Sequence, residues 1–303
     1  MAGAISTGSK PRLLQAGITE LFGMDYKAWK PVHEIVFPKK SSDQNFETAV
    51  QMLGMGMASL KGEGAALALD SYQQGFVRIT THNVWGKRAR VTMEAFDDDL
   101  YMKQASVLSK ELSKALFQAK ETNGAAFINN ATSTSAPYVG GDGKALLATD
   151  HPTKIGTQSN KPSTDSDLTE LALEDAVINI RNFVGDDGLR IVVEPVTLLI
   201  PNQLIFDAQR ILKSQGQSAT ANNDLNALKA LGLLQKIQSW SFLADPDQWT
   251  IITDIDGACL YQRKAPELMM HRDDSTYDYI YSMMERYSFD YYNFRRFYGS
   301  VGA

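Results

Sequence analysis

The stretch DDDLYMKQASVLSKELSKALFQAKETN, residues 97–123, decides the fold, because it carries the longest regular pattern in the chain. Its apolar side chains recur every three or four residues, the spacing of one helical face: Tyr101, Ala105, Leu108, Leu112, Ala115, Leu116 and Ala119. Aspartates stand at its start, where the helix dipole favours negative charge. We therefore predict an amphipathic helix over about residues 98–123, roughly 40 Å long.

A second helix is predicted after a long irregular segment. Residues 131–167 are rich in Gly, Ser, Thr, Pro and Asn, which predicts loops. Asp167 and Glu170 have the spacing of a capping box, and Gly185 is placed to end the helix that they open. The pattern predicts one buried stripe on this helix: Leu168, Leu171, Ala172, Ala176, Ile180, Phe183 and Val184.

The rest of the C-terminal half alternates strand and helix patterns. Residues 189–200 predict a buried strand kinked at Pro195, and a helix is expected to open at Pro201. Aromatic residues are dense over 277–298 and alternate at first with other residues, as on a strand. Further strands are predicted at 235–243, 249–253 and 259–263. This alternation predicts a compact unit of mixed helix and strand.

The N-terminal segment differs from the rest of the chain in its hydrophobic pattern. Nothing in residues 1–45 predicts a core of its own, although 13–22 has the spacing of a short amphipathic helix. Pro31 and Pro38 are expected to hold the chain between them extended. We interpret this segment as an arm that lies on something else.

Residues 46–87 predict a long, flexible hairpin-like excursion. Glycines at 54, 56, 62 and 64 alternate with methionines at 52, 55 and 57, which combines a permissive backbone with adaptable side chains. Residues 76–84 then have strand character, and Gly86 and Lys87 are expected to separate them from a following strand, 88–92.

Composition excludes several classes of protein. The chain has 303 residues with 44% hydrophobic and 21% charged side chains, values typical of folded proteins. Its one cysteine, Cys259, excludes an internal disulfide and any cysteine-cluster metal site. A net charge of −5 without a dense basic run argues against nucleic-acid binding through phosphates. The chain contains no run of about 18 apolar residues, so the sequence predicts no membrane span.

The histidines offer one candidate catalytic pair. His33, His82, His151 and His271 are scattered without metalloprotease spacing. Asp150 beside His151 is the most tempting site, because a carboxylate next to a histidine suits a general base. A rigid turn, with Asp150 capping and Pro152 stiffening it, explains the same residues. We therefore predict no catalytic residue.

Two other motifs do not match the binding loops that they resemble. Residues 140–144 imitate part of a phosphate loop, but Tyr138 and Ala145 occupy positions that require Gly and Ser or Thr. Residues 254–257 are too short for a calcium loop and predict a hairpin turn. We predict no cofactor-binding residue, no metal ligand and no cofactor.

The order of these features resembles the Mu-like major head subunits, tailed-phage major capsid proteins of the Hong Kong 97-type fold. The arm, the excursion, the long helix and the capped α/β unit follow one another as in that family. The motifs that carry the resemblance are VTMEAFDDDLY (91–101), GKALLATDHP (143–152), LLIPNQLIFDAQRILKS (198–214), WTIITD (249–254) and FYGS (297–300). The resemblance implies an α+β capsid fold and no enzymatic activity.

The resemblance also implies four parts. Residues 1–47 would be the N-terminal arm and 48–87 the extended loop. A peripheral domain would combine 88–167 with 259–303 around the long spine helix. Residues 168–258 would form an axial domain facing the centres of pentamers and hexamers.

The implied partners are other copies of the chain in an icosahedral head. Scaffolding protein, maturation protease and portal would be separate proteins. The shell would enclose double-stranded DNA without sequence-specific binding, assemble in the host cytoplasm, involve no membrane and end in the virion. Two alternatives stay open: a cellular encapsulating shell of the same fold, and a cytosolic enzyme that uses Asp150 and His151.

Overall fold

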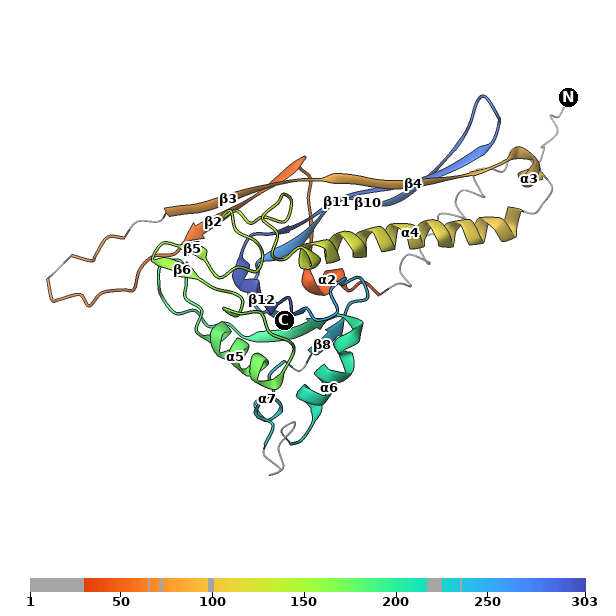
Figure 1. Cartoon of the computed structure of the whole chain (residues 1–303). Helices are drawn as coiled ribbons and strands as arrows, with labels where there is room; N and C mark the ends of the chain where they lie inside the picture. The colour runs from red at the N-terminus through yellow and green to blue at the C-terminus, as the bar shows by residue number, and fades with distance from the viewer. Residues whose placement is uncertain (1–29, 65, 71–72, 98–100, 217–224, 235) are drawn as a thin grey trace.

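The computed structural model describes residues 30–303 except 65, 71–72, 98–100, 217–224 and 235. A four-stranded sheet of order β1-β10-β11-β4 lies beside the long helix α4, and a second sheet of order β12-β9-β7-β8 lies below it in Figure 1. A two-stranded ribbon, β2–β3, projects from one end of the molecule (Figure 1). The predicted mixture of helix and strand is confirmed.

The first sheet carries the longest elements of the fold. Its strands are β1 (Lys39–Ser41), β10 (Ala258–Arg272), β11 (Tyr279–Tyr291) and β4 (Asn83–Val91). Strand β11 pairs antiparallel with both β10 and β4, while β1 pairs parallel with β10. The helices on this side are α2 (His33–Val36), α3 (Met93–Asp97) and α4 (Tyr101–Asn129).

The second sheet is shorter and covered by helices. Its strands are β12 (Phe297–Ser300), β9 (Trp249–Thr253), β7 (Pro195–Ile200) and β8 (Lys236–Ser239). Helices α5 (Glu170–Arg181), α6 (Ile205–Lys213) and α7 (Ala227–Ala230) accompany it, with 3₁₀ turns at Asn202–Leu204 and Phe294–Arg296. The ribbon is β2 (Phe46–Leu53) with β3 (Gln73–Thr81), and a small hairpin is β5 (His151–Thr153) with β6 (Gly156–Gln158).

Buried apolar side chains form three clusters. The largest joins α2, the end of α4, β11 and the near face of the second sheet, through residues such as Phe37, Phe127 and Phe289. A second lies between the other face of that sheet and the helices α5 and α6. The third lies under the first half of α4, around Leu112 and Leu116. The two sheets therefore share one continuous core at the end of α4.

The predicted long helix is confirmed, but its end is different. Helix α4 spans Tyr101–Asn129, 29 residues, and so runs past Gly124 rather than stopping at about 123. A Cβ at Gly124 would lie 3.2 Å from both His33 and Phe289, so glycine serves close packing here instead of ending the helix. Two of the three aspartates expected at its start, Asp98 and Asp99, lie outside the described residues.

The predicted strand break at Gly86 and Lys87 is wrong. Strand β4 continues through both residues, and β3 and β4 are separated at His82 instead. A Cβ at Gly86 would lie 2.7 Å from the carbonyl oxygen of Met283 on β11. Glycine therefore marks a close approach of two strands here, which sequence spacing does not distinguish from a turn.

The predicted capping box is also wrong. Thr169 is the N-cap of α5, and its hydroxyl accepts the backbone N–H of Ala172 at 3.1 Å. Asp167 instead accepts the backbone N–H of Ala303. The helix therefore starts at Glu170, later than predicted. Its buried side includes Leu173 and Val177, whereas Leu171, predicted in the buried stripe, is 67% exposed.

Two proline predictions differ from the structure. The strand predicted over 189–200 begins only at Pro195, because a central strand cannot use a residue without an N–H in its interior. The chain between Pro31 and Pro38 is not extended but forms α2, which buries Val36 and Phe37 completely. The helix expected over 13–22 lies outside the described residues.

The fold predicts that Leu116→Ala destabilises the subunit by about 2–5 kcal/mol, because it removes buried methyl groups between α4 and the sheet. Gln118→Ala, on the exposed side of the same helix, is the control and should change stability by no more than about 0.5 kcal/mol. Urea unfolding of both variants measures the difference. Equal stability of the two would contradict the assigned face of α4.

Candidate assembly interfaces

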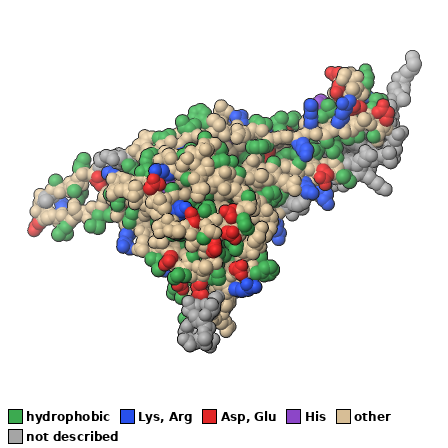
Figure 2. Space-filling model, in the orientation of Figure 1, with side chains coloured by type: hydrophobic (Ala, Val, Ile, Leu, Met, Phe, Trp, Pro, Cys, Tyr) green, Lys and Arg blue, Asp and Glu red, His purple; other side chains and the backbone are tan. Residues whose placement is uncertain are grey.

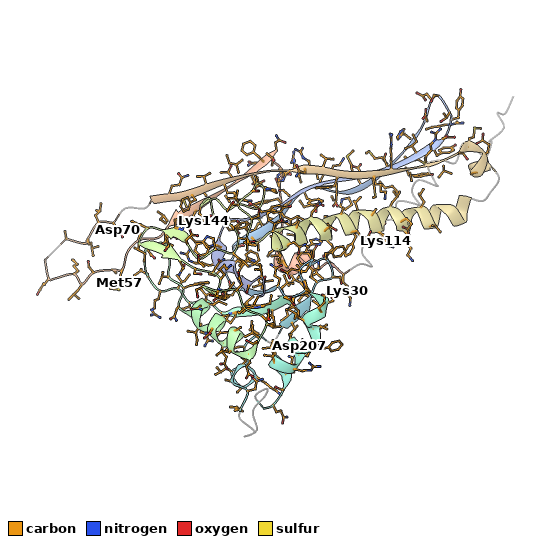
Figure 3. All side chains as sticks on the ribbon, in the orientation of Figure 1. Lys30, Met57, Asp70, Lys114, Lys144 and Asp207 are labelled. Carbon is orange, nitrogen blue, oxygen red and sulfur yellow. The ribbon has the colours of Figure 1, made fainter. Side chains whose placement is uncertain are left out.

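In the described part of the ribbon β2–β3 and of the segment that joins its strands, no side chain belongs to a buried apolar cluster. Leu60 and Leu69 are 100% and 101% exposed, and Met57 is 81% exposed. Other exposed apolar side chains follow the ribbon from root to tip: Phe46, Val50, Met52, Met55, Leu67, Phe76, Val77 and Ile79. Figure 2 shows hydrophobic side chains on this projecting end, and Met57 and Asp70 are labelled there in Figure 3. Such a surface is typical of a segment that another chain covers.

The root of the ribbon is tied firmly to the body. Arg78 on β3 pairs with Asp290, donates to the backbone carbonyl of Pro137 at 2.7 Å and lies over the Tyr291 ring. Burial raises the pKa of the Asp290 carboxyl, which the Arg78 charge opposes. The ribbon therefore leaves the body from a fixed base.

His82 occupies the junction between β3 and β4. Its ring nitrogens lie 3.0 Å from the Ser42 hydroxyl and 2.9 Å from the Ser288 hydroxyl. Burial lowers the pKa of the imidazole, so the neutral ring is favoured. This residue links the ribbon's root to β11 and to the segment between β1 and β2.

Glu121 on α4 is a buried carboxylate with partners from distant segments. One oxygen accepts the Val32 backbone N–H at 2.9 Å and lies 2.8 Å from Nδ1 of His33. The other accepts the indole N–H of Trp240. These contacts join α4 to α2 and to the end of the second sheet.

Lys120, the preceding residue, makes a separate buried ion pair with Glu285 on β11. Its ammonium also donates to the Gln262 side chain at 3.1 Å and lies 4.8 Å from the Tyr287 ring centroid. Burial lowers the pKa of Lys120 and raises that of Glu285. The helix is thus joined to β10 and β11 by charge as well as by apolar packing.

The structure does not bring Asp150 and His151 together as a catalytic pair. His151 is fully buried, with Nδ1 2.6 Å from Asp142, Nε2 3.1 Å from the Asn160 side chain, and its ring stacked on Phe294. Asp150 is exposed and pairs with Lys144. Both ring nitrogens of His151 therefore have partners within the fold, and its ring is buried against Phe294.

The remaining sequence candidates are structural as well. Asp142, inside the failed phosphate loop, accepts the Lys144 backbone N–H, and Asp256, in the predicted turn, pairs with Lys40. Burial raises the pKa of the Cys259 thiol to about 12. Among the described residues no group of three or more His, Cys, Asp or Glu is placed to hold a metal. No described helix is long and apolar enough to span a bilayer.

A groove of about 470 Å³ runs between β3–β4 and the end of α4. Its lining is mainly apolar and aromatic, including Trp85, Phe127 and Tyr138. Among its described lining residues the one formal charge is Arg78, which is already paired with Asp290. The groove has no acid–base pair.

Comparison with known proteins supplies the deciding observation. The family model described as "Phage capsid protein" matches residues 77–298, well over half of the chain. This chain belongs to the phage capsid protein family. No curated protein matches its sequence significantly.

Solved structures agree with this capsid family and show the Hong Kong 97-type fold. The capsid of a native GTA particle is 10% identical over 91% of this chain and 92% of its own, with a TM-score of 0.54. The Mycobacterium phage Che8 chain is 10% identical over 90% and 93%, with a TM-score of 0.52. A phage-related protein from Bordetella bronchiseptica RB50 is 13% identical over 92% and 95%, with a TM-score of 0.51.

The buried charges of this capsid protein escape prediction from the sequence. Lys120 and Glu121 fall among polar residues of the helix pattern, and no spacing rule distinguishes them from solvent-exposed neighbours. Their hydrogen-bond and ion-pair partners lie 88 to 165 residues away along the chain.

We expect Glu121→Ala to destabilise the capsid subunit by about 3–5 kcal/mol, because it leaves the buried His33 and Trp240 groups without their acceptor. Glu111→Ala removes an exposed carboxylate from the same helix and should change stability by no more than about 0.5 kcal/mol. Thermal and urea unfolding compare the two. A similar small effect in both would mean that Glu121 does not hold the junction.

Asp142 generates a prediction for acid stability. Burial alone would raise the pKa of this carboxyl, but its bonds to His151 and to the Lys144 backbone bring it below its ordinary value. Its ionised form therefore stabilises the fold above about pH 4, and this contribution is lost as pH falls through the lower folded pKa. Wild type should be more stable than Asp142→Asn at neutral pH, and the difference should shrink between about pH 4 and 2. Urea unfolding across this range measures it, and a constant difference would contradict the assignment.

Proposed function

We propose that this chain is the major capsid protein that builds the icosahedral head of a tailed phage or prophage around double-stranded DNA. The single observation that carries the proposal is the match to the phage capsid family over residues 77–298. The ribbon adds a physical reason, because its apolar side chains gain burial only from another molecule.

The division into four parts is also proposed. Residues 1–47 form the arm and 48–87 the extended loop; 88–167 with 259–303 form the peripheral domain; 168–258 form the axial domain. The exposed ribbon supports the loop assignment, and the second sheet with α5 and α6 supports the axial one. The boundary at 87 falls inside β4, so the loop and the peripheral domain share that strand.

Placement within the Mu-like branch rests on the motifs between residues 91 and 300. On that placement, scaffolding protein, maturation protease and portal are separate partners, and the shell assembles in the host cytoplasm before it becomes part of the virion. The net charge of −5 supports a container that holds DNA without adhering to its phosphates. Gene neighbours of these three kinds would support this branch over a cellular shell.

We also propose that the subunit has no enzymatic activity of its own. The candidate that the sequence offered, Asp150 with His151, supports this view, because the histidine is sealed between Asp142, Asn160 and Phe294. Its role is to hold the 140–160 segment against the 3₁₀ turn Phe294–Arg296. Hydrolytic activity of pure protein that disappears in His151→Ala would contradict the proposal.

Assembly of purified subunits tests the function directly. With scaffolding protein present, wild type should form shells visible by negative-stain microscopy. Leu60→Ser combined with Leu69→Ser should raise the concentration needed for assembly by about tenfold or more, since each leucine buries apolar area worth about 1.5–3 kcal/mol.

The same double variant should leave the free subunit's unfolding free energy within about 0.5 kcal/mol of wild type, because both leucines are fully exposed there. Thr122→Ser changes an exposed residue of α4, outside the ribbon. It controls for the effect of a surface substitution as such and should assemble normally. Normal assembly of the double variant would mean that the loop tip is not covered in the shell. Absence of shells in wild type would contradict the capsid function itself.

A further inference from the structure

Two helices of the second sheet present apolar side chains to solvent. On α5, Leu171 is 67% and Ile178 is 57% exposed, and the exposed Asp175 lies between them on the same side. On α6, Phe206 is 72% exposed, and Arg210 lies one turn further along. The inward side of each helix is already used, since residues such as Leu173 and Ile211 lie in the core.

These helices lie at opposite edges of the sheet. Helix α5 contacts β12 and α6 contacts β8, and these are the two end strands of the order β12-β9-β7-β8. Figure 1 shows α5 and α6 on opposite flanks of a unit that narrows away from the first sheet. We call the exposed side of α5 the acidic flank and that of α6 the basic flank.

The two flanks are complementary in charge. The acidic flank carries Glu174 and Asp175 between its two apolar residues. The basic flank carries Arg210 and Lys213, both in the last turn of α6, after Phe206. Asp207 pairs with Arg210 at 2.8 Å, but both are more than half exposed, so this pair contributes little to stability.

We propose that the acidic flank of one subunit packs against the basic flank of the next in a ring of capsid subunits. The contact places Leu171 and Ile178 around Phe206 of the neighbour, with Asp175 opposite the neighbour's Arg210. This inference rests on the proposed capsid function and names the partner surface of its axial domain: a second copy of this chain.

The charges select this arrangement over a twofold one. A symmetric contact between two acidic flanks would bring Glu174 and Asp175 against their own copies, and one between two basic flanks would do the same for Arg210. Like charges in such contacts oppose association. A head-to-tail contact uses both flanks of every subunit and closes into a ring when the rotation between subunits permits it.

Charge reversal tests the pairing. Asp175→Arg and Arg210→Asp should each raise the concentration needed for assembly by about tenfold, and the double variant should recover most of the loss. Glu111→Arg, at an exposed carboxylate on α4 and so outside both flanks, is the control for added positive charge. Circular dichroism of the free subunits checks that each variant is folded. Single variants that assemble like wild type, or a folded double variant without recovery, would overturn the pairing.

Cysteine cross-linking gives an independent measurement in assembled shells. The chain's own Cys259 is completely buried, so introduced cysteines report on the flanks. Oxidised shells of Leu171→Cys/Phe206→Cys or Ile178→Cys/Phe206→Cys should give a ladder of linked subunits on a non-reducing gel, whereas Phe206→Cys alone should give none. Shells without a ladder for either pair would overturn the inference and leave the capsid function standing. Failure of wild type to assemble would instead contradict that function.

Discussion

The buried carboxylate of Glu121 is the constraint on which the rest of the subunit depends. A charge in the interior is tolerated only when hydrogen bonds replace the water that it has lost. Here the donors come from Val32 and His33, before the ribbon, and from Trp240, directly after strand β8 of the second sheet. Satisfying one side chain therefore sets α4, the N-terminal segment and the second sheet in a single arrangement, around which the largest apolar cluster packs.

The stability of the subunit and its capacity to associate reside in different parts of the chain. The body has three apolar clusters and buried ion pairs, whereas the described part of the ribbon contributes to none of these clusters. Arg78 and His82 fix only the ribbon's root. A subunit built in this way has a core of its own and still presents apolar surface to its neighbours, which suits a capsid protein.

Buried and exposed charged side chains have different roles in this molecule. Inside the body, Lys120 with Glu285 and His151 with Asp142 hold segments together and are closed to solvent. On the flanks of the second sheet, Asp175 and Arg210 are open to solvent, where pairing affects which surfaces meet more than how tightly the subunit folds. The histidine that sequence alone suggests as a base belongs to the first group, where both of its ring nitrogens already have partners.

The sequence by itself determined the elements whose signal is local. Periodicity predicts α4, the strand Trp249–Thr253 is also predicted, and the glycines and methionines of 46–75 predict a ribbon without a core. At other positions the local sequence fits two structural roles, and only the tertiary structure shows which role the residue has. Gly86 and Gly124 resemble breaks but permit close contact with β11, and Glu121 resembles a surface residue but lies among donors far away in sequence. The physical reason is that close approach and burial depend on what packs against a residue, and those neighbours are brought together only when the whole chain folds.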